Sequence, residues 1–248
     1  MSDPTDPFSE AAKATQEVAK ATGEVAKATD TAIKTADKVG QYFGRTFGDA
    51  IQELAGFAYD KIAVWRFTNL IKQFDDLDEL LKQRRLEGKT TPLPDRISHP
   101  LLRAMAEEDR EPAQELYVKL LANGLTSNAD VEKAYIRILS EISDDETRLI
   151  PVLARLLGGY EVGEKGQEYS IEQISDQTGL TPNRLRKAFH HLASQGCFRI
   201  NPPGEFLELQ RSPDDSWPHI KSDDGLRFYL TDVGLELLIA LSPLPEGS

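Results

Sequence analysis

The chain has 248 residues, of which 40% are hydrophobic, so it can bury one large core or two smaller ones but is too short for three ordinary domains. Lys and Arg number 29 against 41 Asp and Glu, and this net charge of −12 excludes a protein that coats DNA or membranes non-specifically. Cys197 is the only cysteine, which excludes an intrachain disulfide and a multi-cysteine zinc site. With an acidic start and no long apolar run, we expect a cytoplasmic protein.

The sequence predicts a mainly α-helical fold with two modules. An N-terminal helical bundle begins with a long Ala-rich amphipathic helix, and a C-terminal winged helix-turn-helix adds a small antiparallel hairpin or sheet. We expect the following segments: a disordered start over 1–10, the Ala-rich helix over 11–50, a helical domain over 51–158, the winged helix over 159–242 and a flexible tail over 243–248.

The Ala-rich helix is predicted from a seven-residue repeat, which reads AKATQEV, AKATGEV, AKATDTA and IKTADKV from Ala12. Steps of three and four give one continuous apolar stripe, and lysines recur on the opposite face. Alanine buries little area, so this helix needs a partner surface, either its own protein or a sister chain in a homo-oligomer. A membrane surface is the less favoured partner, because the stripe lacks bulky Trp, Phe and Leu anchors.

Three glycines follow this helix at spacings of four residues, namely Gly40, Gly44 and Gly48. This spacing puts them on one helical face, where a second helix backbone can approach closely. Charged residues interrupt the surrounding segment, so we interpret the glycines as helix-packing positions in a soluble bundle.

The next hundred residues have helical spacing of their apolar positions and contain no convincing strand. A helix is expected from Ile51 to about Leu86, ended by Gly88 and the segment TTPLP. Further helices are expected over Pro100–Glu108, Pro112–Asn123, Val131–Ile142 and Asp144–Leu157. Ser143 and Glu146 have the spacing of a capping box at the start of the last of these helices.

Several blocks of this region, in this order, resemble the Abi-alpha (abortive infection alpha) family of bacterial phage-defence proteins. The blocks are Trp65-Arg-Phe-Thr-Asn69, Pro92-Leu-Pro94, Pro100–Glu108, Glu115–Asn123 and Ile138–Leu149. They cover a little under half of the chain. The resemblance implies a helical fold and a role in phage defence, and it supplies no catalytic motif.

The residues after Gly159 predict a winged helix. Ser170–Gln177 forms a short helix that opens with a capping box, Thr178–Leu180 forms a tight turn, and a second helix begins at Thr181-Pro-Asn. In the second helix Leu185, Ala188, Phe189 and Leu192 make the buried face. Strands are expected at Cys197–Ile200, Phe206–Leu209 and Leu226–Leu230, followed by a helix over Asp232–Leu241.

Six residues are the candidates for contact with duplex DNA or a protein partner: Asn183, Arg184, Arg186, Lys187, His190 and Arg199. Residues 181–201 contain four basic residues and no acid, so the second helix suits a major groove. The loops between the later strands contain four aspartates, which would repel phosphates. The sequence leaves both partners open.

No catalytic or cofactor motif is found: the chain has no P-loop, no dinucleotide fingerprint and no nucleophile elbow. His190 and His191 point about 100° apart on a helix and cannot readily chelate one metal ion. We therefore expect a non-enzymatic phage-defence protein of the abortive-infection type, without cofactor or metal, that binds a macromolecule through its winged helix. The alternatives are a DNA-binding transcription regulator whose helical part dimerises or senses a ligand, and a peripheral effector that perturbs membranes.

Overall fold

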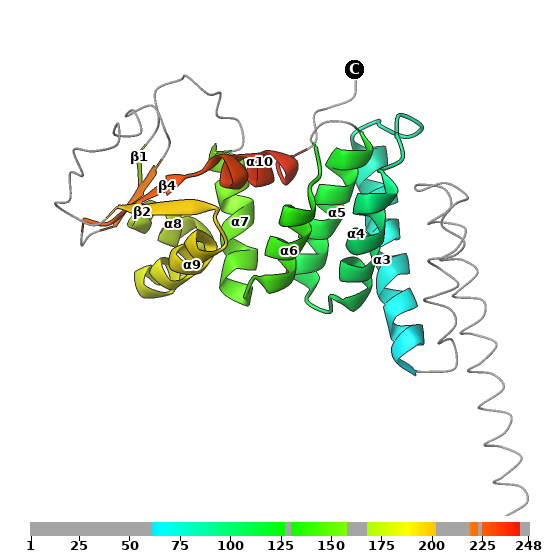
Figure 1. Cartoon of the computed structure of the whole chain (residues 1–248), viewed down its shortest axis with the longest axis horizontal. Helices are drawn as coiled ribbons and strands as arrows, with labels where there is room; N and C mark the ends of the chain where they lie inside the picture. Colours follow the sequence, from blue (N-terminus) through cyan, green and yellow to red (C-terminus); the bar gives the residue numbers. More distant parts are fainter. Residues whose placement is uncertain (1–60, 127–129, 158–167, 202–218, 223–224, 244–248) are drawn as a thin grey trace, which may run out of the picture. The chain divides into compact units, whose positions relative to one another are not determined.

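The computed structural model describes residues 61–126, 130–157, 168–201, 219–222 and 225–243 (Figure 1). The chain divides into two units, 1–74 and 75–248, and helix α3 (Lys61–Gln83) runs from the first into the second. The predicted Ala-rich helix, the three packing glycines and the predicted strand over 206–209 lie outside the described residues.

Four helices follow α3 and confirm the predicted helical region: α4 (Asp95–Glu107), α5 (Glu111–Leu125), α6 (Lys133–Glu141) and α7 (Asp144–Leu157). Helix α4 begins five residues before the predicted start, so Pro100 lies inside it. The Ser98 hydroxyl donates to the carbonyls of Leu93 and Pro94, at 3.0 and 2.9 Å, and this fixes the first turn. Pro100 sits only one turn further on, where its ring removes a single helical hydrogen bond.

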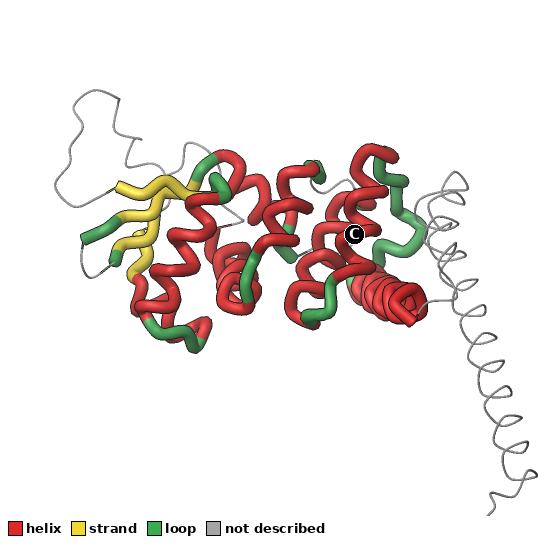
Figure 2. Tube along the Cα trace, turned by 60° about the horizontal axis from the view of Figure 1, so that its bottom comes forward, coloured by secondary structure: helices red, strands yellow, loops and turns green. Residues whose placement is uncertain are grey.

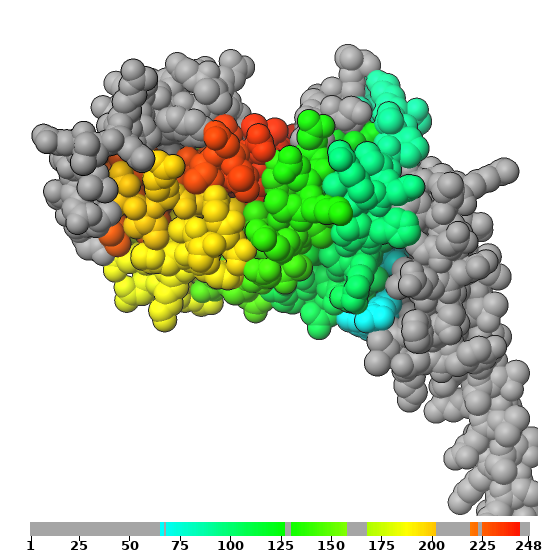
Figure 3. Space-filling model, viewed as in Figure 1, coloured from blue at the N-terminus to red at the C-terminus, as the bar shows by residue number. Residues whose placement is uncertain are grey.

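Helix α7 is the central element of the unit formed by residues 75–248, because it contacts α5, α8 (Ile171–Thr178), α9 (Pro182–Ser194) and α10 (Asp232–Ala240). Its side chains Leu149, Ile150, Leu153 and Leu157 are at most 1% exposed. In Figure 3 the yellow atoms of α8 and α9 adjoin the green atoms of the preceding helices. The predicted boundary at residue 158 thus falls directly after α7, a helix that packs both against the helices before it and against the predicted winged helix after it.

The sheet has four short strands in the order β1-β3-β4-β2. Figure 2 draws the strands in yellow. Their bounds are β1 (Glu168–Ser170), β2 (Phe198–Asn201), β3 (His219–Lys221) and β4 (Arg227–Leu230). Strand β4 pairs antiparallel with β2 and β3, as expected for a hairpin, whereas β1 pairs parallel with β3. The sheet is therefore mixed and not purely antiparallel, because a strand that precedes α8 joins its edge.

Helix α9 packs on one face of this sheet through Phe189. The Phe189 ring meets Phe198 of β2 edge-on at 5.3 Å and stacks on Phe228 of β4 at 5.0 Å. All three rings are at most 4% exposed. This aromatic cluster fixes the position of α9 relative to the strands.

Helix α10 is attached to the start of β2 through its N-cap residue, Thr231. The Thr231 hydroxyl donates to the carbonyls of Gly196 and Cys197, at 2.6 and 3.0 Å, and accepts from the Gly234 N–H at 3.1 Å. The Thr231 N–H also donates to the Cys197 carbonyl, at 3.1 Å. These bonds satisfy backbone groups that the strand and the helix would otherwise leave unpaired.

Cys197 is buried beneath this junction, with 3% of its surface exposed, and burial raises the pKa of its thiol to about 12. At pH 8 about one thiol in 10,000 is then a thiolate, which is the reactive form. We expect the native protein to react with a disulfide reagent such as DTNB at least about 100-fold more slowly than the protein unfolded in guanidinium. Equal rates in the two conditions would contradict this placement of Cys197.

Among the described residues, none of the helices combines the length and the apolar character that a membrane span needs.

Candidate functional site

The pair of helices α8 and α9 forms as the local sequence predicts. The Ser170 hydroxyl accepts from the Gln173 N–H at 3.2 Å, and the Gln173 side chain accepts from the Ser170 N–H at 2.8 Å, which completes the capping box. Gly179 ends α8 in the left-handed conformation, with φ of 69°. Thr181 and Pro182 then start α9. The turn between the helices is therefore set by residues with specific backbone preferences.

Helix α9 has a buried face and a free face. Leu185, Ala188, Phe189 and Leu192 are buried, as predicted. The opposite face presents Asn183, Lys187, His190 and Ser194, which are all exposed. The half-buried Arg186 lies at the edge of this free face and donates to the Asn183 side chain at 3.1 Å. We call the four exposed residues, Asn183, Lys187, His190 and Ser194, the free face of α9, and Arg186 borders it.

Arg184, another of the predicted contact residues, lies on the flank of α9 that faces helix α7. Its guanidinium forms a bidentate pair with Asp145, in which Nε donates to Oδ2 at 2.9 Å and Nη2 donates to Oδ1. The hydrogen bond and then the charge of Asp145 raise the pKa of Arg184. Three of the five predicted α9 residues thus lie on the free face, Arg186 borders it, and the fifth, Arg184, is held by an intramolecular carboxylate.

The same flank makes two further polar contacts with the helices before it. His191 Nδ1 lies 2.8 Å from Oε1 of Glu146, a residue that is 1% exposed. Gln195 donates to Glu141 at 2.6 Å. Residues 184, 191 and 195 follow the i, i+7, i+11 spacing of one helix edge, so the whole length of α9 is fastened along this edge.

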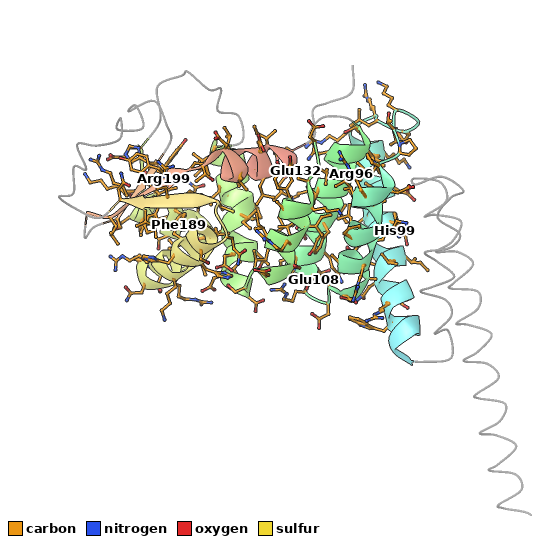
Figure 4. All side chains as sticks on the ribbon, viewed as in Figure 1. Arg96, His99, Glu108, Glu132, Phe189 and Arg199 are labelled. Atoms are coloured by element: carbon orange, nitrogen blue, oxygen red, sulfur yellow. The ribbon has the colours of Figure 1, made fainter. Side chains whose placement is uncertain are left out.

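Arg199 lies on the other side of the sheet from α9. Side chains alternate along a strand, and Phe198 faces α9, so the neighbouring Arg199 points away from it. Figure 4 shows Arg199 and Phe189 on opposite sides of β2. The six predicted residues therefore do not form one surface. The sequence of α9 does not show on which side of the sheet the next strand, β2, presents Arg199.

The face of the sheet that carries Arg199 also contains a histidine that the sequence did not single out. His219 Nε2 lies 3.0 Å from Glu168 Oε2, and the His219 ring stacks on Tyr229 at 4.9 Å. The hydrogen bond from His219 and the nearby Lys221 charge lower the pKa of Glu168. This contact ties β1 to β3, and its two residues lie 51 positions apart, which sequence spacing could not reveal.

The acidic start of α7, Asp144-Asp145-Glu146, also contacts other elements. Asp144 lies 3.8 Å from Arg110 of the α4–α5 junction, whereas Asp145 and Glu146 hold α9. Glu146 also accepts from the Ser143 N–H, which is one half of the predicted capping box. Figure 4 shows Glu108, the bidentate partner of Arg110, at the same edge of the helices. Three consecutive acids thus link α7 to two separate elements.

Within the described ranges, no three His, Cys, Asp or Glu side chains are grouped closely enough to hold a metal ion. The two histidine contacts described above, to Glu146 and to Glu168, are pairs.

The comparison with family models gives a match to the family described as Abortive infection alpha, over residues 68–238. The match covers more than half of the chain, so the chain belongs to the abortive infection alpha family. The matched region extends past α7 and includes α8, α9, the sheet and most of α10, whereas the blocks recognised in the sequence end near Leu149. Neither the curated proteins nor the solved structures give a match.

Proposed function

We propose that this protein acts in phage defence of the abortive-infection type by binding a macromolecule and not by catalysis. In this proposal α7, α8, α9 and the sheet form a winged helix, and α9 enters the major groove of duplex DNA. The observation that carries the proposal is the free face of α9, on which Asn183, Lys187, His190 and Ser194 are exposed, although the His190 ring also meets Phe228 edge-on at 5.6 Å.

The chemistry of the free face suits base edges and phosphates. Asn183 has the side-chain type that forms bidentate bonds with adenine, and Arg186, which borders this face, has the type that does so with guanine. Lys187 adds a cation, and His190 and Ser194 add hydrogen-bonding groups. The absence of bulky apolar side chains and of acids from this face favours nucleic acid over an ordinary protein interface, whose centre is usually apolar.

The packing of α9 provides the rigidity that a groove-reading helix requires. Phe189 fixes its inner side against the sheet, and the contacts of Arg184 and His191 fix its flank to α7. A helix held on two sides loses little further conformational entropy when it binds, so more of the contact energy contributes to affinity.

Replacing Lys187 with glutamate tests the proposed contact. We expect the affinity of the full chain for duplex DNA at low ionic strength to fall at least about tenfold, because a phosphate-facing cation becomes an anion. Fluorescence anisotropy over a salt series is the measurement. Lys133→Glu is the matched control, because Lys133 is an exposed lysine on α6, outside the free face, and its reversal changes the net charge equally. Equal losses in the two variants would contradict a contact at α9.

Phage plating tests the biological part of the proposal. Cells that carry the gene should plate a broad phage panel less efficiently than cells without it, and Lys187→Glu should abolish the difference while Lys133→Glu preserves it. Lys187-dependent DNA binding without any defence would instead favour a transcription regulator. The membrane alternative depends on the N-terminal residues, which lie outside the described ranges.

A protein partner is the second candidate for the same face, and the exposed acids around α9 favour it. Glu172 and Asp176 are exposed on α8, and Asp144 is exposed at the start of α7. A long duplex would bring phosphates toward these carboxylates, whereas a narrow acidic helix of a protein could meet the free face alone. Capture by the wild-type chain of a protein that Lys187→Glu fails to capture, without binding of duplex DNA, would support this candidate.

A further inference from the structure

Arg184 stands out among the cations of α9 because its guanidinium is occupied by an intramolecular carboxylate. Asp145 accepts two parallel hydrogen bonds from it, through Nε and Nη2. A phosphate group offers two oxygens in the same arrangement, and the bidentate geometry that binds a carboxylate also binds a phosphate. Asp145 therefore occupies the position that a DNA phosphate would take at this side chain.

The position of Arg184 on the helix fits such a contact. Residues at the centre of the free face point to the floor of a groove, whereas residues on the flank of the first turn meet the phosphates of the groove wall. Arg184 is the third residue of α9 and lies on its flank. Its side chain is 54% exposed, so a phosphate can approach without any displacement of the core.

Replacement of the Asp145 carboxylate by a DNA phosphate at Arg184 should cost the protein little stability. An exposed ion pair contributes little to stability because water screens it, so its replacement costs the protein little. Asp145 is 21% exposed in its side chain and lies in the first turn of α7, where the helix dipole also favours its charge. The charge of the neighbouring Asp144, whose side chain is 78% exposed, also acts on Arg184, after the larger effect of Asp145.

We propose that the Arg184 guanidinium binds a DNA phosphate when Asp145 does not occupy it. Asp145 thus lowers the affinity of the protein for duplex DNA by competing for this guanidinium. The proposal rests on the function proposed above, because it requires α9 to lie in a groove. The start of α7 would then control DNA binding at α9, because any event that moves Asp145 away from Arg184 makes one more cation available to the DNA.

A cycle of variants in the full chain tests the competition. Asp145→Asn should raise the affinity for a 20-base-pair duplex about three- to tenfold, and should steepen the slope of log K against log salt by about one, as one added phosphate contact does. Arg184→Ala in the Asp145→Asn background should remove the gain. The matched control is Asp144→Asn, which deletes the same charge from the same turn but leaves the Arg184 pair intact, and it should change affinity less. Thermal melting checks that every variant is folded.

The outcomes separate this proposal from the proposed function. If Lys187→Glu weakens binding but Asp145→Asn does not strengthen it, the competition is disproved and the α9 contact stands. A gain that persists without Arg184, or that Asp144→Asn reproduces, would mean that only the general charge matters and would also disprove the competition. If neither the wild type nor Asp145→Asn binds duplex DNA, both proposals fail. Binding that appears only in Asp145→Asn, and only with Arg184 present, would support the competition most strongly.

Discussion

Replacing Gly234 with alanine is expected to lower the free energy of unfolding by about 3 kcal/mol or more, because the added methyl group meets backbone that has no room to move. A Cβ atom at this position of α10 would lie 2.1 Å from the Cys197 carbonyl oxygen and 2.9 Å from its carbon. Helix propensity alone predicts the opposite sign, since alanine is favoured over glycine by about 1 kcal/mol inside a helix. The sign of the change therefore tests directly the contact between α10 and Cys197, the residue before β2.

The measurement is the midpoint of thermal unfolding, which should fall by about 6–12 °C for this loss in a unit of this size. DTNB labelling of Cys197 should accelerate in the same variant, because the displaced helix uncovers the thiol. Gly88→Ala is the control, since Gly88 has φ of 72° and nothing within 4 Å of an added Cβ. Its loss should stay near 1–2 kcal/mol, the cost of the left-handed conformation alone. An unchanged or higher midpoint in Gly234→Ala would show that α10 does not approach β2 so closely.

The bounds of α7, α8 and α9 could be predicted from the sequence because local residues set them. Ser143 and Ser170 start two of these helices through capping interactions, Pro182 fits the first turn of the third, and Gly179 ends α8. Each signal acts within four residues, so it does not depend on the rest of the fold. The buried face of α9 was predictable for a similar reason, since it needs only the period of a helix.

The features that the sequence could not show depend on contacts between distant residues. Strands β1 and β3 have three residues each, which is too short for a visible alternation of apolar and polar residues. The pairing of Arg184 with Asp145 joins residues 39 positions apart. An exposed arginine on a helix flank has the same local sequence whether or not it is paired, so the sequence could not show that Arg184 contacts Asp145.

Asn123 of α5 makes the described hydrogen bonds that join the residues farthest apart in sequence within residues 75–248, and replacing it is the second change with a large expected effect on stability. Its amide is fully buried and donates to the carbonyls of Ala240 and Ser242, at 2.9 and 3.0 Å. The Ala240 carbonyl belongs to the last residue of α10 and the Ser242 carbonyl follows it, where no helical N–H is available to them. The Ser242 hydroxyl adds a bond to the Ala154 carbonyl of α7, at 3.2 Å, so the end of α10 is fastened to two helices.

Asn123→Ala should therefore lower the free energy of unfolding by about 2–4 kcal/mol, because the buried Ala240 carbonyl and the part-buried Ser242 carbonyl lose their donor and a small cavity is left. Asn123→Asp keeps the volume but replaces the donor with an anion that faces the same carbonyls, so we expect a loss at least as large. Urea unfolding measures both. Gln83→Ala is the control, since the Gln83 amide donates to Glu79 on the exposed side of α3 and its loss should stay within about 0.5 kcal/mol. If Asn123→Asp were as stable as the wild type, the amide would not be the donor that holds α10, because volume alone would then account for any loss in Asn123→Ala.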